Sequence, residues 1–342
     1  MSKLPVNEIT LEGKIVRADY RKGVSKNGKP FLSANFTLDI DGNQIKCESF
    51  AMQYKADNVT ETSNYTGLNT IFSEAKALHK TIKEVGEDKS TEIQDNTIVE
   101  NIEETTAIKC SNWNGFKYCK FGESSYMSNG ELVKNTKIEF AYCNRVDEDK
   151  REYNPTRDFE VCGLVKIAPV VIEKDDVEFM QMTIIVPTYQ EAYNDRPAKV
   201  TLQEIKLVCH DSSAWGYLED NFEIGCVVYL NGKIVRTVER IENEVEVEDG
   251  RGFGRAMARQ KTYTTNINEY LEVLGGYTLE TDEVENMPEF SQELWEKAKE
   301  EKENKEQEMK QEKPSEPDRT FGRKQAPSQQ TSQPKKNNTL PF

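Results

Sequence analysis

Near its start the chain reads Glu8-Ile9-Thr10-Leu11-Glu12-Gly13-Lys14-Ile15-Val16-Arg17, a run in which apolar and polar residues alternate with a period near two. Such alternation is typical of a β-strand with one buried face. A polar turn follows at residues 22–29, and the alternation resumes over residues 31–40. Asp41-Gly42 predicts a tight hairpin into a third strand at residues 44–52. Three strands joined by two tight turns predict one curved sheet.

The next segment, residues 67–79, changes to a helical period. One face of that helix is apolar and contains Leu68, Ile71, Phe72, Ala75 and Leu78. An acidic connector is expected up to about Thr105, and strand patterns return at residues 107–110 and 137–143. Three strands, a helix and two further strands follow the order of the OB-fold, a five-stranded Greek-key barrel.

The same order of elements repeats in the second half of the chain. Strand patterns occupy residues 158–171, 178–186, 199–210, 226–235 and 267–278, with a short helix at residues 212–218 after the third strand. The predicted fold class is therefore mainly β, with two tandem OB-fold barrels. We expect the first domain to span residues 1–155, with a helical and acidic insert at 57–106, and the second domain to span residues 156–285.

A charged helix is predicted at residues 286–313 and a disordered tail at residues 314–342. Phe290, Leu294 and Trp295 can dock the first turns of the helix on the body, while the rest is expected to be a solvated spacer. The tail is rich in Ser, Gln, Pro and Lys, so it cannot bury enough apolar surface to offset the entropy of ordering. It ends on Leu340, Pro341 and Phe342, which we interpret as a peptide hook for a pocket of another protein. The alternative is an unused terminus that ends on a hydrophobic residue.

Composition limits the classes to which the protein can belong. The 342 residues include seven cysteines without a Cys-x-x-Cys pair, and only two histidines, His79 and His210. We therefore expect reduced cysteines in the core and no metal site. No secretion signal opens the chain, and no apolar run approaches the ~18 residues needed to cross a bilayer. The expectation is a soluble cytoplasmic protein without a membrane partner.

The net charge of −15 is unevenly distributed along the chain. Residues 152–250 carry nine Lys and Arg against twenty Asp and Glu, and residues 57–106 carry four against eleven. Residues 1–56 carry nine against six, and residues 107–151 carry eight against six. The first domain without its insert is therefore basic, and local patches rather than the total charge decide whether a polyanion binds.

No catalytic site can be assembled from the sequence. Residues 23–29 have the spacing of a phosphate-binding loop, but Pro30 replaces the Ser or Thr that would hold magnesium, and a strand follows where a helix is needed. Two histidines do not support a Ser-His-Asp or Cys-His set. We therefore expect a non-catalytic protein without a cofactor.

Aromatic and basic residues interleave between residues 113 and 126, which we place in or beside the loop that joins strands four and five. The aromatic residues are Trp113, Phe116, Tyr118, Phe121 and Tyr126, and the lysines are Lys117 and Lys120. Exposed aromatic rings can stack on nucleobases while lysines contact phosphates. The alternative is that these aromatic residues point into the barrel, and we expect about half of them to do so.

The loop between strands one and two is the other rim of an OB groove. Its candidate nucleic-acid-binding residues are Tyr20, Arg21, Lys22, Lys26, Lys29 and Phe31. Both rims that clasp an oligonucleotide in an OB-fold are thus basic, and one is also aromatic.

A third basic segment, residues 250–261, lies between strands four and five of the second domain. It contributes Arg251, Phe253, Arg255, Arg259 and Lys261. The segment begins like the RNP1 pattern of an RRM, but Arg255 and Ala258 stand where aromatic residues should. A flexible basic loop that closes over a bound strand fits better, and the alternative is a solvated loop without function.

With these parts the chain resembles the single-stranded DNA-binding (SSB) protein family, in a large two-barrel form like those of phages or mobile elements. That family combines OB-folds with a disordered Gln/Pro/Ser-rich linker and a tip that commonly ends in Pro-Phe, as Pro341 and Phe342 do here. Acidic residues precede the tip in the family, whereas residues 337–339 are Asn, Asn and Thr. The resemblance implies single-stranded DNA as the ligand and a role in DNA replication, recombination or repair. It also implies recruitment of partner proteins by the tip and, for a phage protein, the host-cell cytoplasm.

The leading hypothesis is a non-catalytic protein that binds single-stranded DNA through residues 20–31 and 113–126, helped by residues 251–261. Such binding is expected to depend strongly on salt. A second hypothesis is an acidic adaptor that assembles a protein complex through its second barrel and tail. RNA binding is a third, because base stacking does not sense the 2′-hydroxyl. The sequence fixes neither the oligomeric state nor the length of strand that is bound.

Overall fold

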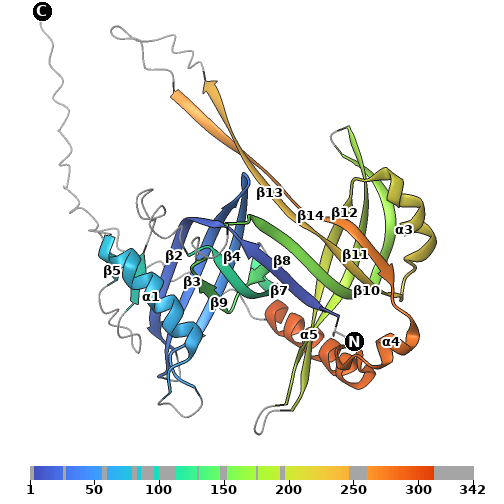
Figure 1. The fold of residues 1–342 in the computed structure, drawn as a ribbon, viewed down its shortest axis with the longest axis horizontal. Coiled ribbons are helices and arrows are strands. Elements are labelled where there is room, and N and C mark those ends of the chain that lie inside the picture. The colour runs from blue at the N-terminus through green and yellow to red at the C-terminus, as the bar shows by residue number, and fades with distance from the viewer. Residues whose placement is uncertain are drawn as a thin grey trace, which may run out of the picture.

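The computed structural model of the chain describes residues 4–25, 28–55, 60–78, 83–85, 96–99, 113–128, 131–146, 152–174, 176–192, 197–245 and 260–311. These residues form two closed five-stranded barrels that lie side by side, with a long helix packed beneath them (Figure 1). The predicted fold class, mainly β with two tandem OB-fold barrels, is confirmed. The expected strand at 107–110 and the tail at 314–342, with Leu340, Pro341 and Phe342, lie outside the described residues. The domain boundary at residues 155 and 156 stays a prediction.

The first barrel consists of β1 (Asn7–Glu12), β2 (Lys14–Val24), β3 (Pro30–Ile40), β4 (Asn43–Met52), β7 (Gly115–Ser128) and β8 (Glu131–Glu139). β2, β3 and β4 form the predicted antiparallel meander. β4 runs parallel to β8 at Glu48 and Glu139, β8 pairs with β7, and β7 pairs with β1. Because β1 and β2 are two halves of one bent strand, this circuit is that of an OB-fold.

The first strand bends at Gly13, between β1 and β2. A Cβ atom at this position would lie 2.4 Å from Cγ1 of Ile40, so a larger residue would displace the core. The Gly13 N–H donates to the carbonyl oxygen of Asn114 at 3.0 Å. The bend lets one strand serve both sides of the barrel, since its first half pairs with β7 and its second half with β3.

The core of the first barrel comes from the inward-facing residues of alternating strands. On β3 every second residue is buried, namely Leu32, Ala34, Phe36, Leu38 and Ile40. The predicted helix is α1 (Ser63–Leu78), which packs against β3, β4 and β9 (Tyr142–Asn144). Its buried face contains Tyr65, Leu68, Ile71 and Phe72. The side chains of Ala75 and Leu78, expected on the same face, lie outside the described part of the chain.

One expectation for the first domain is wrong. Residues 113–126 were expected in or beside the loop that joins strands four and five, but most of them form β7, the fourth strand itself, in which a bulge interrupts the alternation. The segment expected as an acidic connector contains two short strands, β5 (Lys83–Val85) and β6 (Asn96–Val99). β6 pairs with β2 and so extends the sheet of the first barrel.

The second barrel repeats the circuit with β10 (Thr156–Lys174), β11 (Val177–Gln190), β12 (Lys199–Cys209), β13 (Val227–Val245) and β14 (Gln260–Thr278). β12 runs parallel to β14 at Val208 and Glu272, and β13 closes the barrel on β10. The predicted short helix is present as η1 (Ser212–Ala214) and α3 (Trp215–Asn221). β13 and β14 stay paired as far as Val245 and Gln260, so their ribbon projects beyond the barrel (Figure 1).

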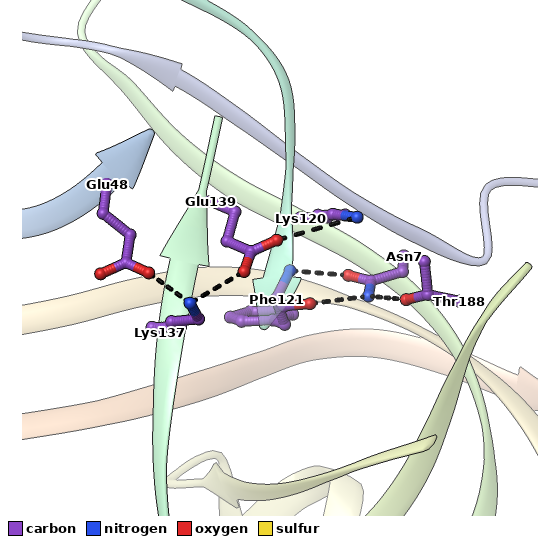
Figure 2. A network of polar contacts seen from close by, with 7 residues as sticks. All are labelled: Asn7, Glu48, Lys120, Phe121, Lys137, Glu139 and Thr188. Carbon is purple, nitrogen blue, oxygen red and sulfur yellow. Dashed lines mark hydrogen bonds and ion pairs between the residues drawn. The ribbon is translucent and has the colours of Figure 1, made fainter. Parts of the chain in front are cut away.

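The two barrels are joined edge to edge, because β1 pairs antiparallel with β10 along its whole length. The Asn7 side chain reinforces this junction (Figure 2). Its Oδ1 accepts from the Phe121 N–H at 2.8 Å, and its Nδ2 donates to the Phe121 carbonyl at 3.1 Å and to Thr188 Oγ1 at 2.9 Å. The Phe121 ring packs edge-on against Phe159 of β10, with 5.8 Å between the ring centroids. The tandem barrels therefore share one sheet and one hydrophobic core.

Three helical segments follow the second barrel: α4 (Thr281–Glu285), η2 (Pro288–Phe290) and α5 (Gln292–Gln311). Trp295 stacks on Phe290 with 5.4 Å between the centroids, and both pack with Leu294 against Val200 and Leu202 of β12. The predicted docking of the first turns is confirmed.

The expectation that the rest of this helix is a solvated spacer is wrong. Lys302 Nζ donates to Glu123 Oε2 of β7 at 2.7 Å and to the Leu202 carbonyl of β12 at 3.1 Å. One turn later, Glu306 pairs with Lys134 of β8 at 2.6 Å. α5 is therefore a strap that contacts both barrels. None of the described helices combines the length and apolar character needed to cross a bilayer.

Candidate nucleic-acid interface

Two phenylalanines lie on the outer surface of the meander in the first barrel. Residues on β3 and β4 that alternate with the core point outward, and these include Phe31 and Phe50. Their rings stack with 5.3 Å between the centroids and 28° between the planes. Phe50 is 58% exposed, and the guanidinium of Arg21 lies 5.8 Å from the centre of the Phe31 ring. This end of the barrel thus presents an aromatic surface with a cation beside it.

Tyr118 is held outward by a β-bulge. Ile9 pairs with Cys119 and Leu11 with Phe116, so two residues of β7 face one residue of β1. Tyr118 occupies the left-handed region with φ of 55°, which is unusual for a bulky residue and costs about 1–2 kcal/mol. Its ring is 73% exposed. Backbone strain that places an aromatic ring in solvent is a feature to expect of a binding site rather than of a core.

A second tyrosine supports Tyr118 from β9. The rings of Tyr118 and Tyr142 meet edge-on, with 5.5 Å between the centroids. The Tyr142 hydroxyl lies 3.0 Å from Ser63 Oγ at the start of α1, which fixes the ring in place. Tyr142 itself is 36% exposed.

A hollow of about 250 Å³ connects the phenylalanines to the tyrosines, since Phe50 and Tyr118 both line it. Lys120 and Lys137 line the same hollow. We call this surface the aromatic face, and its residues are Arg21, Phe31, Phe50, Tyr118, Lys120 and Tyr142.

Lysines and glutamates alternate across the floor of the aromatic face (Figure 2). Lys137 Nζ forms ion pairs with Glu48 and, at 3.0 Å, with Glu139, while Lys120 Nζ lies 3.8 Å from Glu139. Burial alone would lower the pKa of Lys137, but its hydrogen bonds to Glu48 and Glu139 outweigh burial and raise that pKa. Because these charges largely neutralise one another, the face offers more stacking surface than net positive charge.

The aromatic face brings together four of the residues predicted from the sequence, namely Arg21, Phe31, Tyr118 and Lys120. Three other predicted residues are wrong as base-stacking groups because they are core residues: Tyr20, Phe116 and Phe121 are 1%, 4% and 1% exposed. Tyr20 packs edge-on against Phe36, and Phe116 packs against Phe36 and Phe140.

The remaining predicted residues of the first domain do not line the hollow. Trp113 is half-buried, with the Arg145 guanidinium 4.7 Å above its ring. Lys29, Lys117 and Tyr126 are exposed and Lys22 is half-buried, and none of the four lines the hollow.

Several predicted residues lie outside the described part of the chain. They are Lys26 and, in the basic segment of the second domain, Arg251, Phe253, Arg255 and Arg259. Of Lys261 only the backbone is described, as part of β14.

The sequence analysis missed two residues of the aromatic face, Phe50 and Tyr142, and also Lys137, which lines its hollow. The position of Phe50 could have been predicted from the alternation of β4. Ile45, Cys47 and Ala51 face the core, so Phe50 must point to the opposite face. For Tyr142 no such signal exists, since its position depends on β9 pairing with the bulged part of β7.

None of the six cysteines in the described residues forms a disulfide, and five of them are buried. Burial raises the pKa of the Cys119 and Cys162 thiols to about 12. Since the thiolate is the nucleophilic form, neither group is prepared for nucleophilic catalysis near neutral pH.

Comparison with known proteins identifies a family model and a set of similar solved structures. Residues 119–313, more than half of the chain, match the protein-family model described as YorF. No curated protein matches the chain. A Plasmodium falciparum SSB complex with ssDNA is 11% identical, covers 37% of this chain and 97% of its own, and has a TM-score of 0.25. A small single-stranded DNA-binding protein from Streptomyces coelicolor is 8% identical, covers 36% of this chain and 93% of its own, and has a TM-score of 0.22.

Proposed function

The chain belongs to the YorF family, and we propose from its own residues that it is a non-catalytic protein that binds single-stranded DNA through the aromatic face. The observation that carries the proposal is Tyr118, a ring that is 73% exposed on a backbone held at positive φ. Together with Phe31 and Phe50 it offers flat apolar surfaces on the side of the barrel where OB-folds bind oligonucleotides.

Stacking explains why the ligand should be single-stranded. Each base that stacks on an aromatic side chain contributes about 1–3 kcal/mol, whatever its identity. In a duplex those base faces are already covered by neighbouring pairs, so the same surface gains little from it. Binding is therefore expected to be largely independent of sequence and weak for duplex DNA.

The cellular role is proposed on the sequence resemblance. We assign the protein to DNA replication, recombination or repair, with the tip Leu340-Pro341-Phe342 recruiting other proteins of those processes. A pull-down with full-length protein and a variant that lacks Leu340 to Phe342 tests this part. Equal recovery of partners by both forms would contradict it.

The ligand is tested by fluorescence anisotropy with labelled oligo-dT, duplex DNA and oligo-U at two salt concentrations. Tight binding of oligo-dT that weakens with salt and spares the duplex is the expected result. Equal binding of oligo-U would extend the ligand to RNA. No binding to any of the three at low salt would contradict the proposal.

A second candidate function is protein binding by the second barrel. Ile167, Val170, Val171 and Val177 are each 40–50% exposed on the hairpin of β10 and β11. Several exposed apolar side chains on one hairpin of an acidic barrel favour a protein partner. Protein binding by the second barrel would become the favoured function if the anisotropy titrations showed no nucleic-acid binding.

A further inference from the structure

The register of the second barrel reproduces the positions that build the aromatic face of the first. β4 meets β8 at Glu48 and Glu139, and β12 meets β14 at Val208 and Glu272. Phe50 lies two residues after Glu48, and His210 lies two residues after Val208, so Phe50 and His210 occupy corresponding positions. Lys137 lies two residues before Glu139, and Tyr270 lies two residues before Glu272, so these two residues also correspond.

Those positions in the second barrel also form an aromatic cluster. The His210 ring lies 5.5 Å from Phe179 and 5.0 Å from Tyr270, centroid to centroid. Glu272 accepts a hydrogen bond from the His210 backbone N–H at 2.9 Å, and its other oxygen lies 2.6 Å from His210 Nδ1, so the ring is held in place. With Ile267, which is 50% exposed, these rings line a hollow of about 480 Å³. We call Phe179, His210, Ile267 and Tyr270 the second aromatic face.

A third hollow, of about 400 Å³, lies between the barrels and joins the two faces. Its polar lining includes Arg17 and Lys46 from the first barrel and Arg236 from the second. It shares Glu48 and Lys137 with the hollow of the aromatic face. It shares Glu269 with the hollow of the second aromatic face. The three hollows therefore adjoin one another across both barrels, and we call this succession of hollows the track.

Most carboxylates along this track are neutralised by neighbours. Arg236 donates to Glu269 at 2.9 Å and to the Gln44 carbonyl of the first barrel at 2.8 Å. Arg17 pairs with Asp19 at 3.1 Å, and Glu48 and Glu139 share Lys137. Glu239 is the acidic lining residue for which no ion pair is found within the described residues.

Two lysines along the track can contact phosphates. Lys46 in the central hollow and Lys174 beside the second aromatic face are exposed, and among the described residues neither forms an ion pair. The track thus has stacking surfaces at its two ends and a lysine in its middle, a combination of aromatic rings and positive charge that suits a single nucleic-acid strand.

We propose that one continuous strand of DNA occupies this track, with bases stacked on both aromatic faces and the backbone crossing the hollow between the barrels. This inference rests on the proposed function and extends it to the second barrel. Two linked half-sites bind a strand long enough to reach both far more tightly than a strand that reaches only one.

The test measures affinity for oligo-dT of increasing length, from about 6 to about 30 nucleotides, because one OB-fold covers about 4–16 nucleotides. It compares wild-type full-length protein with Phe179→Leu/Tyr270→Leu, which keeps apolar volume but removes two stacking rings. Tyr217→Ala is the matched control, because Tyr217 is 48% exposed on α3 and lines none of the three hollows.

The expected result is that long oligonucleotides bind the double variant at least about tenfold more weakly than the wild type, with short ones unchanged. Tyr217→Ala should match the wild type at every length. Unchanged affinity of the folded double variant for long oligonucleotides would overturn the shared track while leaving the first-barrel site intact. A wild type that binds no oligo-dT of any length would overturn the proposed function itself. If the double variant does not fold, the exposed His210→Ala is measured in its place against the same two outcomes.

Discussion

The two barrels have the same strand circuit but use corresponding positions differently. On the first barrel Lys137 forms ion pairs with both Glu48 and Glu139, and the exposed residues Phe50 and Tyr118 line the same hollow. On the second barrel Tyr270 takes the place of Lys137, and His210 takes the place of Phe50. The difference shows that the fold fixes where a ligand surface lies, while single residues decide how much stacking and charge it offers.

The barrels also bend their fourth strands in different ways. In the second barrel the register of β13 shifts at Gly232, where a Cβ atom would lie only 1.9 Å from the Glu272 carbonyl oxygen. In the first barrel the irregular position of β7 is Tyr118, with its positive φ. Gly232 permits the close approach of Glu272 because it has no side chain, whereas Tyr118 accepts backbone strain and places its ring in solvent.

The largest effect is expected from Phe116→Ala, which opens a cavity in the first barrel. The free energy of unfolding should fall by about 3–5 kcal/mol. Because β1 and β10 join the barrels in one sheet, urea unfolding followed by circular dichroism should still show a single transition. Two separated transitions would break the comparison, since the barrels would then be independent units.

The junction itself is tested by Asn7→Ala, which removes three hydrogen bonds and leaves the Phe121 N–H and carbonyl without their partner. The free energy of unfolding should fall by about 2–3 kcal/mol. The matched control is Asn35→Ala, an exposed residue of β3, with a change of less than about 0.5 kcal/mol. Equal effects of the two variants would show that the Asn7 side chain does not join the barrels.

A smaller effect is expected at Tyr118, the strained position of the first barrel, where the second barrel has Gly232. Tyr118→Gly should be more stable than Tyr118→Ala by about 1 kcal/mol, because glycine adopts positive φ without strain. Thermal or urea unfolding of the two variants measures this difference. If alanine were the more stable of the two, the backbone at residue 118 would not be strained.

The smallest effect is a loss of stability in alkali that both barrels share. The folded state raises the pKa of Cys119 and Cys162 to about 12, so the unfolded thiols ionise first. Their stabilisation is complete below the unfolded pKa and declines as the pH rises toward about 12. Between about pH 8 and pH 9 the loss should be roughly half a kcal/mol per thiol. Cys162→Ala should flatten the dependence of unfolding free energy on pH, and an unchanged slope would contradict the assignment.

The barrels could be predicted because their signals are local. Asp41-Gly42 and the alternation over residues 31–40 and 44–52 identify a hairpin without any tertiary information. The fourth strand of the first barrel was misplaced because Lys117 and Tyr118 form a bulge, which shifts the alternation in the middle of the strand.

The joining of the barrels could not be predicted. The pairing of Asn7 with Val161 links residues far apart in sequence, and both edges read as ordinary strands. The strap was missed for a different reason. Lys302 and Glu306 look like solvated charges in a Glu- and Lys-rich helix, and only the folded chain places Glu123 and Lys134 opposite them.

The predicted binding residues also show the difference between what local sequence identifies and what only the fold reveals. Composition identified an aromatic and basic segment, but which rings are exposed depends on strand phase. Phe116 and Phe121 face the core, while Tyr118 between them faces solvent. Phe50, which lies outside residues 113–126, is more exposed than Phe116 or Phe121.

The central claim is tested most directly by titrating labelled oligo-dT with the wild type, Phe50→Ala/Tyr118→Ala and Tyr217→Ala. The loss of two stacking rings should weaken binding by the double variant at least about thirtyfold, while Tyr217→Ala binds like the wild type. A folded double variant whose affinity stays within about twofold of the wild type would show that the aromatic face does not bind single-stranded DNA.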